Sequence, residues 1–196
     1  VLTRLGQKDR ADEMLASAFE AAKTSDHEAR QLERALRSAG DPELLLRALS
    51  LRLDRSDLDG AARAGAQSEL ADILASLGRH DQALAALLGA LEHDPGSSAL
   101  LLRIITAARA TGSDAVKRTV AAIEPLADRA EAEGRAPVAA ALFLTLGDLA
   151  ERDLAEPTRA LAAYTRAETF GAEPAAVWRA IDRAAAAAGD GAAQIR

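Results

Sequence analysis

Residues 64–98, AGAQSELADILASLGRHDQALAALLGALEHDPGSS, decide the fold of this 196-residue chain. In the first half of this stretch, apolar residues recur at helical spacing: Leu70, Ile73, Leu74 and Leu77. Gly78 predicts the end of that helix, since glycine adopts the left-handed conformation of a helix C-terminus at little cost. A second amphipathic run follows, and Pro95-Gly96 stops it. The stretch therefore predicts two antiparallel helices joined by a short turn.

The small residues of this hairpin follow the pattern of a known repeat. Leu70-Ala71 places a small residue directly after a large one on the first helix, and Pro95 follows the second helix. On that second helix, small, large and small residues alternate: Ala83, Leu87 and Ala90. In these positions the stretch resembles a tetratricopeptide repeat, although Gln67 and Leu74 stand where that family usually carries aromatic residues. The resemblance implies an array of stacked helical hairpins.

Turn glycines repeat along the chain with the period of this hairpin. Gly6, Gly40, Gly78 and Gly112 are 34, 38 and 34 residues apart, and 34 is the tetratricopeptide length. We expect helices to end within about two residues of each glycine. The pattern predicts a single tetratricopeptide-like array over residues 1–196, with a related helical-hairpin array as the alternative. Its predicted units span about 1–24, 25–57, 58–96, 97–135 and 136–172, followed by a terminal helix at 173–189.

The amino-acid composition favours helices throughout. Alanine and leucine, the strongest apolar helix formers, are abundant, and β-branched residues are few. Phe19, Phe143, Tyr164 and Trp178 are expected to pack between helices. The predicted fold class is all-α: an α-solenoid of about five stacked antiparallel hairpins.

Charge and missing residue types narrow the possible functions. A net charge of −6 argues against a nucleic-acid binder that depends on neutralising phosphates. The chain has no cysteine, which excludes disulfides and thiolate zinc sites. No run of 18 apolar residues occurs, so we expect no membrane insertion. The start at a valine in mid-hairpin predicts a piece of a longer bacterial repeat protein; a cytoplasmic location is favoured, but a targeting signal of the parent would not be visible.

No pattern in the sequence predicts an enzyme. His27, His80 and His93 are dispersed without metal-binding spacing, and His80 and His93 are expected at helix ends. The nucleophile elbow, the P-loop and the dinucleotide-binding glycine motif do not occur. We therefore expect no catalytic residue, no metal site and no cofactor.

The resemblance implies a partner-binding surface on the first helix of each hairpin. Tetratricopeptide arrays bind peptides, helices or domains of other proteins in a concave groove lined by these helices. Arg30, Arg34 and Arg37 share one stripe at i, i+4 and i+7, which would favour an acidic partner segment. The same face adds four candidates: Ser68, Asp72, Arg103 and Arg109. The alternative for all of these residues is a solvated helix face.

Two functions from different classes fit these observations. The first is a non-catalytic protein–protein interaction scaffold that binds a peptide or helix of a partner in its concave groove. The second is a sensory or regulatory helical domain that binds a small ligand or peptide and controls an attached output domain. Recognition of chaperone tails is not expected, because Ser68 and Asp72 stand where the family's carboxylate clamp would begin. Mixed charge argues against a pentatricopeptide RNA binder, and the sequence predicts neither the partner's identity nor the oligomeric state.

Overall fold

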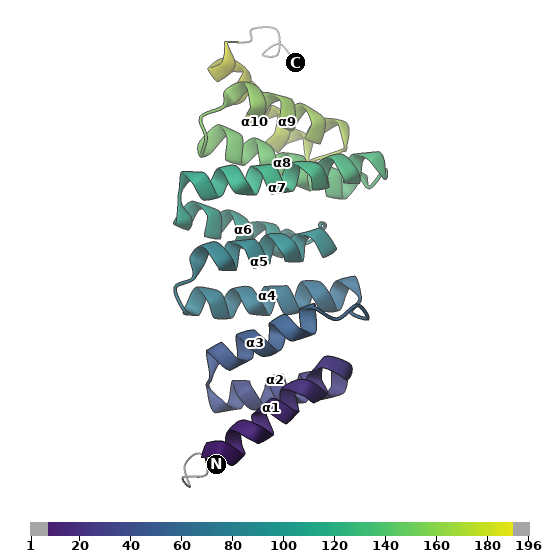
Figure 1. The fold of residues 1–196 in the computed structure, drawn as a ribbon. Coiled ribbons are helices and arrows are strands. Elements are labelled where there is room, and N and C mark those ends of the chain that lie inside the picture. The colour runs from purple at the N-terminus through teal and green to yellow at the C-terminus, as the bar shows by residue number, and fades with distance from the viewer. Residues whose placement is uncertain (1–7, 190–196) are drawn as a thin grey trace.

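The computed structural model describes residues 8–189 of the chain. This range folds into an all-α solenoid, as predicted, in which the helices stack in chain order from one end to the other (Figure 1). Within it there are ten helices and no strand: α1 (Lys8–Thr24), α2 (Asp26–Ala39), α3 (Pro42–Leu53), α4 (Gly60–Ser76), α5 (His80–His93), α6 (Ser98–Thr111), α7 (Ser113–Ala132), α8 (Ala136–Arg152), α9 (Pro157–Thr169) and α10 (Pro174–Ala188).

Three of the four turn glycines mark helix ends as predicted. α2, α4 and α6 end at or within two residues of Gly40, Gly78 and Gly112, whereas Gly6 lies outside the described residues. Gly40 has a φ of 72°, a left-handed conformation that favours glycine. Its N–H donates to the carbonyl of Arg37, which satisfies a carbonyl of the last helical turn. The division of the chain into repeat units at 25, 58, 97 and 136 stays a proposal.

The helix starts follow local capping chemistry, with one exception. The side chains of Ser25 and Asp41 accept hydrogen bonds from backbone N–H groups three residues later, as is typical of N-caps. A serine directly after a turn glycine predicts an N-cap, but Ser113 is the first helical residue of α7, and the cap position belongs to Gly112, which has no side chain to offer. A proline within a helical run predicts a kink, yet α7 continues through Pro125 as one helix to Ala132.

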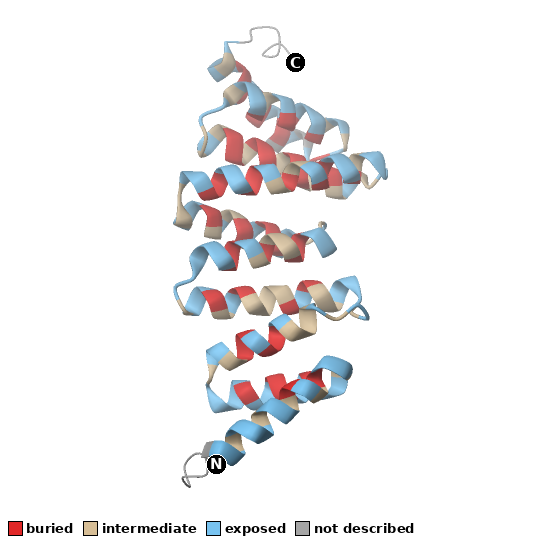
Figure 2. Cartoon of the chain, in the orientation of Figure 1, coloured by how far each residue is buried: buried red, intermediate tan, exposed pale blue. Residues whose placement is uncertain are grey.

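Buried apolar residues form the core, and Figure 2 colours the buried positions of each helix red. One buried cluster lies mainly among α1, α2 and α3, and a larger one extends from Leu46 of α3 to α10. Leu70 and Ile73 of α4 pack against both clusters and so join them. Ala71, Ala83 and Ala90, the small residues of the repeat pattern, are almost completely buried.

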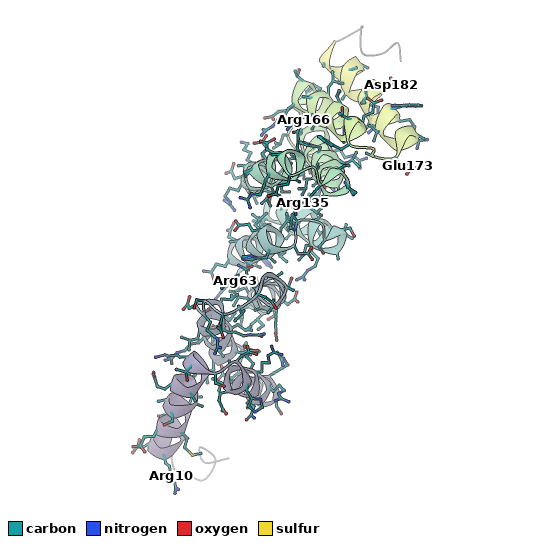
Figure 3. All side chains as sticks on the ribbon, turned by 90° about the vertical axis from the view of Figure 1, so that its right-hand side faces the viewer. Arg10, Arg63, Arg135, Arg166, Glu173 and Asp182 are labelled. Atoms are coloured by element: carbon teal, nitrogen blue, oxygen red, sulfur yellow. The ribbon has the colours of Figure 1, made fainter. Side chains whose placement is uncertain are left out.

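The six residues between α3 and α4 form the longest connection between the described helices. Arg63, labelled in Figure 3, holds this connection: its guanidinium donates to the carbonyls of Leu53 (2.6 Å) and Arg55 (2.7 Å). Arg55 in turn pairs with Asp57 at 2.5 Å. These contacts fix the angle at which α4 continues the stack after α3.

Candidate partner-binding surface

Helices α2, α4, α6, α8 and α10 begin the predicted units, and we call the surface they form the even-helix face. Each neighbouring pair of these helices is bridged by an arginine–carboxylate pair. The bridges are Arg37–Glu69, Arg103–Asp72, Arg109–Asp148 and Arg183–Glu151. The two residues of each bridge are 31 to 39 positions apart, about one repeat length. Much of the charge on this face therefore links one hairpin to the next.

The odd-numbered helices from α3 to α9 are joined in the same way, with Arg79 placed directly before α5. Their bridges are Arg79–Glu43, Arg118–Asp81, Arg159–Glu124 and Arg166–Asp128, with separations of 35 to 38 positions. A single exposed pair of this kind contributes only about 0–1 kcal/mol to stability. Together, however, the pairs favour one alignment of neighbouring hairpins. If one helix were displaced by a turn along its axis, its arginine would no longer reach the carboxylate of the next hairpin.

Most of the predicted site residues take part in these bridges. Arg37 reaches the neighbouring α4, so the arginine stripe of α2 is not the free surface that the sequence suggested. Arg103 donates to Asp72 at 2.6 Å and to the backbone carbonyl of Ser68 at 3.4 Å. The hydrogen bonds from Arg109 to Asp153, and then to Asp148, raise the pKa of its guanidinium further above its ordinary value. Arg109 is thus a fixed structural contact.

A group of basic side chains, which we call the α2 arginine cluster, surrounds a hollow of about 450 Å³. Its lining residues are His27, Arg30, Glu33, Arg34, Arg37 and Arg52. Glu33 is only 4% exposed, and its Oε2 accepts a 3.2 Å hydrogen bond from Arg52 of α3. Burial raises the pKa of Glu33, and the charge of Arg52 opposes that rise. The floor of the hollow is therefore a buried ion pair.

The α2 arginine cluster keeps one unneutralised cation. Arg30 and Arg52 share Asp26, Arg52 also holds Glu33, and Arg37 holds Glu69. Arg34 donates only to the backbone carbonyl of Arg30 and has no carboxylate partner among residues 8–189. Four guanidinium groups thus meet three carboxylates, and the excess charge lies at Arg34.

A second hollow, which we call the α4–α6 groove, lies between α4 and α6 with α5 as its floor. Its volume is about 440 Å³. Alkyl side chains supply most of its lining: Ala71, Ala75, Ala83, Leu87, Leu102, Ala107 and Ala110. The hydroxyls of Thr106 and Thr111 donate to carbonyls of their own helix, each at 2.8 Å, so neither has a hydrogen left to donate to a ligand. Leu102 is 67% exposed.

The Arg103–Asp72 pair lies on the rim of the α4–α6 groove. Arg103 also lines a neighbouring, more polar hollow of about 610 Å³, together with Ser68 and His93. Ser68, Asp72 and Arg103, which were chosen from helix periodicity, are therefore brought together here. The groove itself was not predicted. The sequence contains one indication of the groove: α4 and α6 carry small residues at positions where larger side chains would fill the space between them.

The aromatic residues follow the predictions with one exception. Phe19, Phe143 and Tyr164 are buried, as expected. Tyr164 donates to Glu151 at 2.8 Å, and burial raises the pKa of its hydroxyl. Trp178 was expected to pack between helices but is 53% exposed, with its indole N–H donating to Glu168 at 2.7 Å. α10 is the last described helix, and no following helix covers that side within this range.

His80 and His93 are the first and last residues of α5, as predicted for helix ends. Over the described part of the chain, no group of three or more His, Cys, Asp or Glu side chains is placed to hold a metal ion. No helix in that part is both long and apolar enough to cross a bilayer.

Comparison with known proteins supports the fold. No protein-family model matches the sequence, and no curated protein matches it. The crystal structure of BtubC (BKLC) from P. vanneervenii has 18% sequence identity and a TM-score of 0.51, covering 93% of this chain and 86% of that one. A crystal structure of MamA has 17% identity and a TM-score of 0.46, covering 83% and 81%. At these identities the similarity concerns the fold alone: a helical-repeat solenoid of the tetratricopeptide-like kind.

Proposed function

We propose that this chain is a non-catalytic protein–protein interaction module that binds a peptide or helix of a partner across its even-helix face. The observation that carries the proposal is the excess positive charge of the α2 arginine cluster, on a face whose other arginines are largely neutralised. Arg30 and Arg34 are both exposed. The cluster and the α4–α6 groove are lined mainly by arginines, paired carboxylates and alkyl groups, with one histidine in each, His27 and His80. Such a lining is suited to recognition rather than to bond making.

The charge favours an acidic partner segment. An exposed cationic cluster attracts carboxylates mainly by steering the encounter and fixing the register, and it adds less to the final affinity. The attraction should weaken as salt rises, since the screening length falls to about 8 Å at physiological ionic strength. Arg37 is omitted from this role because its bridge to Glu69 holds α2 against α4.

The first prediction tests this surface by charge reversal. We expect Arg30→Glu with Arg34→Glu to weaken binding of a synthetic glutamate-rich peptide by about tenfold or more at low salt. Helicity should not change, because both side chains are exposed and neither belongs to the core. Fluorescence anisotropy with labelled peptide measures the affinity, and circular dichroism measures the helicity.

The control changes the same amount of charge on the other face. Lys117 and Arg129 are exposed residues of α7, so Lys117→Glu with Arg129→Glu makes the whole chain equally more acidic. We expect this control to bind the peptide nearly as well as the unaltered protein does. Equal losses in both variants would show that the peptide responds to net charge rather than to the α2 arginine cluster, and the proposal would then be wrong.

A further inference from the structure

We infer that the α4–α6 groove is a second contact for the same partner segment and takes an apolar side chain of about leucine size. The partner would then carry an acidic residue for the α2 arginine cluster and an apolar residue about 20 Å or more away. This inference rests on the proposed function, because it concerns the same face and the same bound segment.

The lining of the α4–α6 groove selects an apolar occupant. Its walls are mainly methyl and isobutyl groups, and its threonine hydroxyls are already bonded to their own helix. A volume of about 440 Å³ lies in the range of roughly 300–1,000 Å³ that ligand sites in proteins occupy. Leu102 on its rim is one of three large apolar side chains that are mostly exposed among the described residues. Met14 and Trp178, the other two, belong to the first and last helices.

Charge at the rim is balanced, so the two contacts differ in chemistry. Asp72 and Arg103 neutralise one another there, with their side chains 71% and 37% exposed. An acidic group gains little at this pair, while the backbone of a bound segment can still hydrogen-bond to it. The preference for acid therefore belongs to the α2 arginine cluster, and the preference for an apolar side chain belongs to the groove.

The two contacts lie on one continuous surface. Arg37 of the α2 arginine cluster binds Glu69 of α4, and Asp72, one helical turn further along α4, binds Arg103 of α6. Even helices in direct packing contact are about 8–10 Å apart, so the two steps from α2 to α6 span about 20 Å or more. An extended segment covers this distance with about six or more residues, at roughly 3.3 Å each. This spacing defines the partner: an acidic residue and an apolar residue at least about six positions apart.

Three synthetic peptides test the inference. The first carries a glutamate cluster with a leucine about six to eight residues away, the second has the leucine about two residues away, and the third has alanine in place of leucine. We expect the first to bind about tenfold more tightly than either of the others. In protein labelled at its alanine methyl groups, the first peptide should shift the NMR signals of Ala75 and Ala110.

Variants that fill the groove provide the decisive comparison. Ala75 and Ala110 are exposed and line the groove, so Ala75→Leu with Ala110→Leu should occupy its space without disturbing the core. We expect this variant to lose the preference for leucine and to bind the alanine peptide as before. Ala121→Leu, at an exposed position of α7, is the matched control and should keep the preference.

The outcomes separate this inference from the proposed function. Equal affinity for the leucine and alanine peptides, or a preference that survives filling of the groove, would overturn the inference and leave the acidic contact intact. Equal affinity at both leucine spacings would also overturn it. Failure of all three peptides to bind would overturn the proposed function as well.

Discussion

Replacing Arg52 with methionine is expected to lower the free energy of unfolding by on the order of 3 kcal/mol. Arg52 and Glu33 are both largely buried between α2 and α3, and their side chains meet at 3.2 Å. Methionine keeps most of the apolar stem but leaves the Glu33 carboxylate without its cation. Removing one partner of a buried pair costs more than the pair itself contributes, because the remaining charge stays desolvated. Urea denaturation followed by circular dichroism measures the change.

The same variant should make stability more dependent on pH. Burial already raises the pKa of Glu33 in the folded protein above its value in the unfolded chain. A group with a raised pKa stabilises the folded state fully at pH values below its unfolded pKa, and this stabilisation is lost as the pH rises through its folded pKa. Without Arg52 the folded pKa rises further, because the charge that opposed the rise is gone. The gap in stability between the two proteins should therefore widen as the pH rises above the ordinary pKa of a glutamate, about 4.3.

A double variant separates lost charge from lost packing. Glu33→Leu with Arg52→Met removes both charges, and apolar replacement of a buried ion pair is often neutral or stabilising. We expect this protein to recover most of the stability lost by Arg52→Met and to lose the added pH dependence. A double variant as unstable as the single one would mean that Arg52 acts through packing or through Asp26, and not through Glu33.

The fold could be predicted from the sequence because its determinants are local. Helix periodicity, the turn glycines and N-caps such as Ser25 and Asp41 all act within a few residues of one another. The period of about 34 residues then implies stacking, since a hairpin alone cannot bury its apolar face. The terminal helix expected at residues 173–189 is α10, which begins at Pro174 because proline suits the first turn of a helix. The prediction that Trp178 packs between helices was wrong. Its exposure depends on whether another helix covers α10, and the sequence of α10 does not show this.

The candidate site was only partly predictable, because its chemistry depends on pairs distant in sequence. Periodicity places Arg30, Arg34 and Arg37 on one face, but it does not show that Arg37 meets a carboxylate 32 residues later. The stripe therefore suggested three free charges, whereas the structure leaves the excess at Arg34. Ser68, Asp72 and Arg103 were chosen correctly as neighbours on one face. The groove beside them exists because the side chains that line it are small. No single residue of the sequence indicates such a groove.

Replacing Gly147 with alanine is expected to cost about 1–3 kcal/mol of stability, although alanine is the better helix former. A Cβ at this position of α8 would lie 2.4 Å from Cε1 of Tyr164, well inside van der Waals contact. The ring has little room to move, because it is buried and its hydroxyl is bonded to Glu151. Arg183 of α10 donates to both oxygens of that carboxylate, at 3.0 and 3.1 Å, and so fixes it. Thermal and urea denaturation measure the loss.

Two comparisons make the Gly147 prediction specific. Gly65 is an exposed helical glycine where an added Cβ would meet nothing within 4 Å, so Gly65→Ala should be stabilising by about 0.5–1 kcal/mol. The double variant Gly147→Ala with Tyr164→Leu removes the ring together with the glycine. That combination should cost less than the sum of its two single changes, because leucine removes the ring that the new methyl group meets. Strictly additive costs would show that the ring and the glycine do not constrain one another.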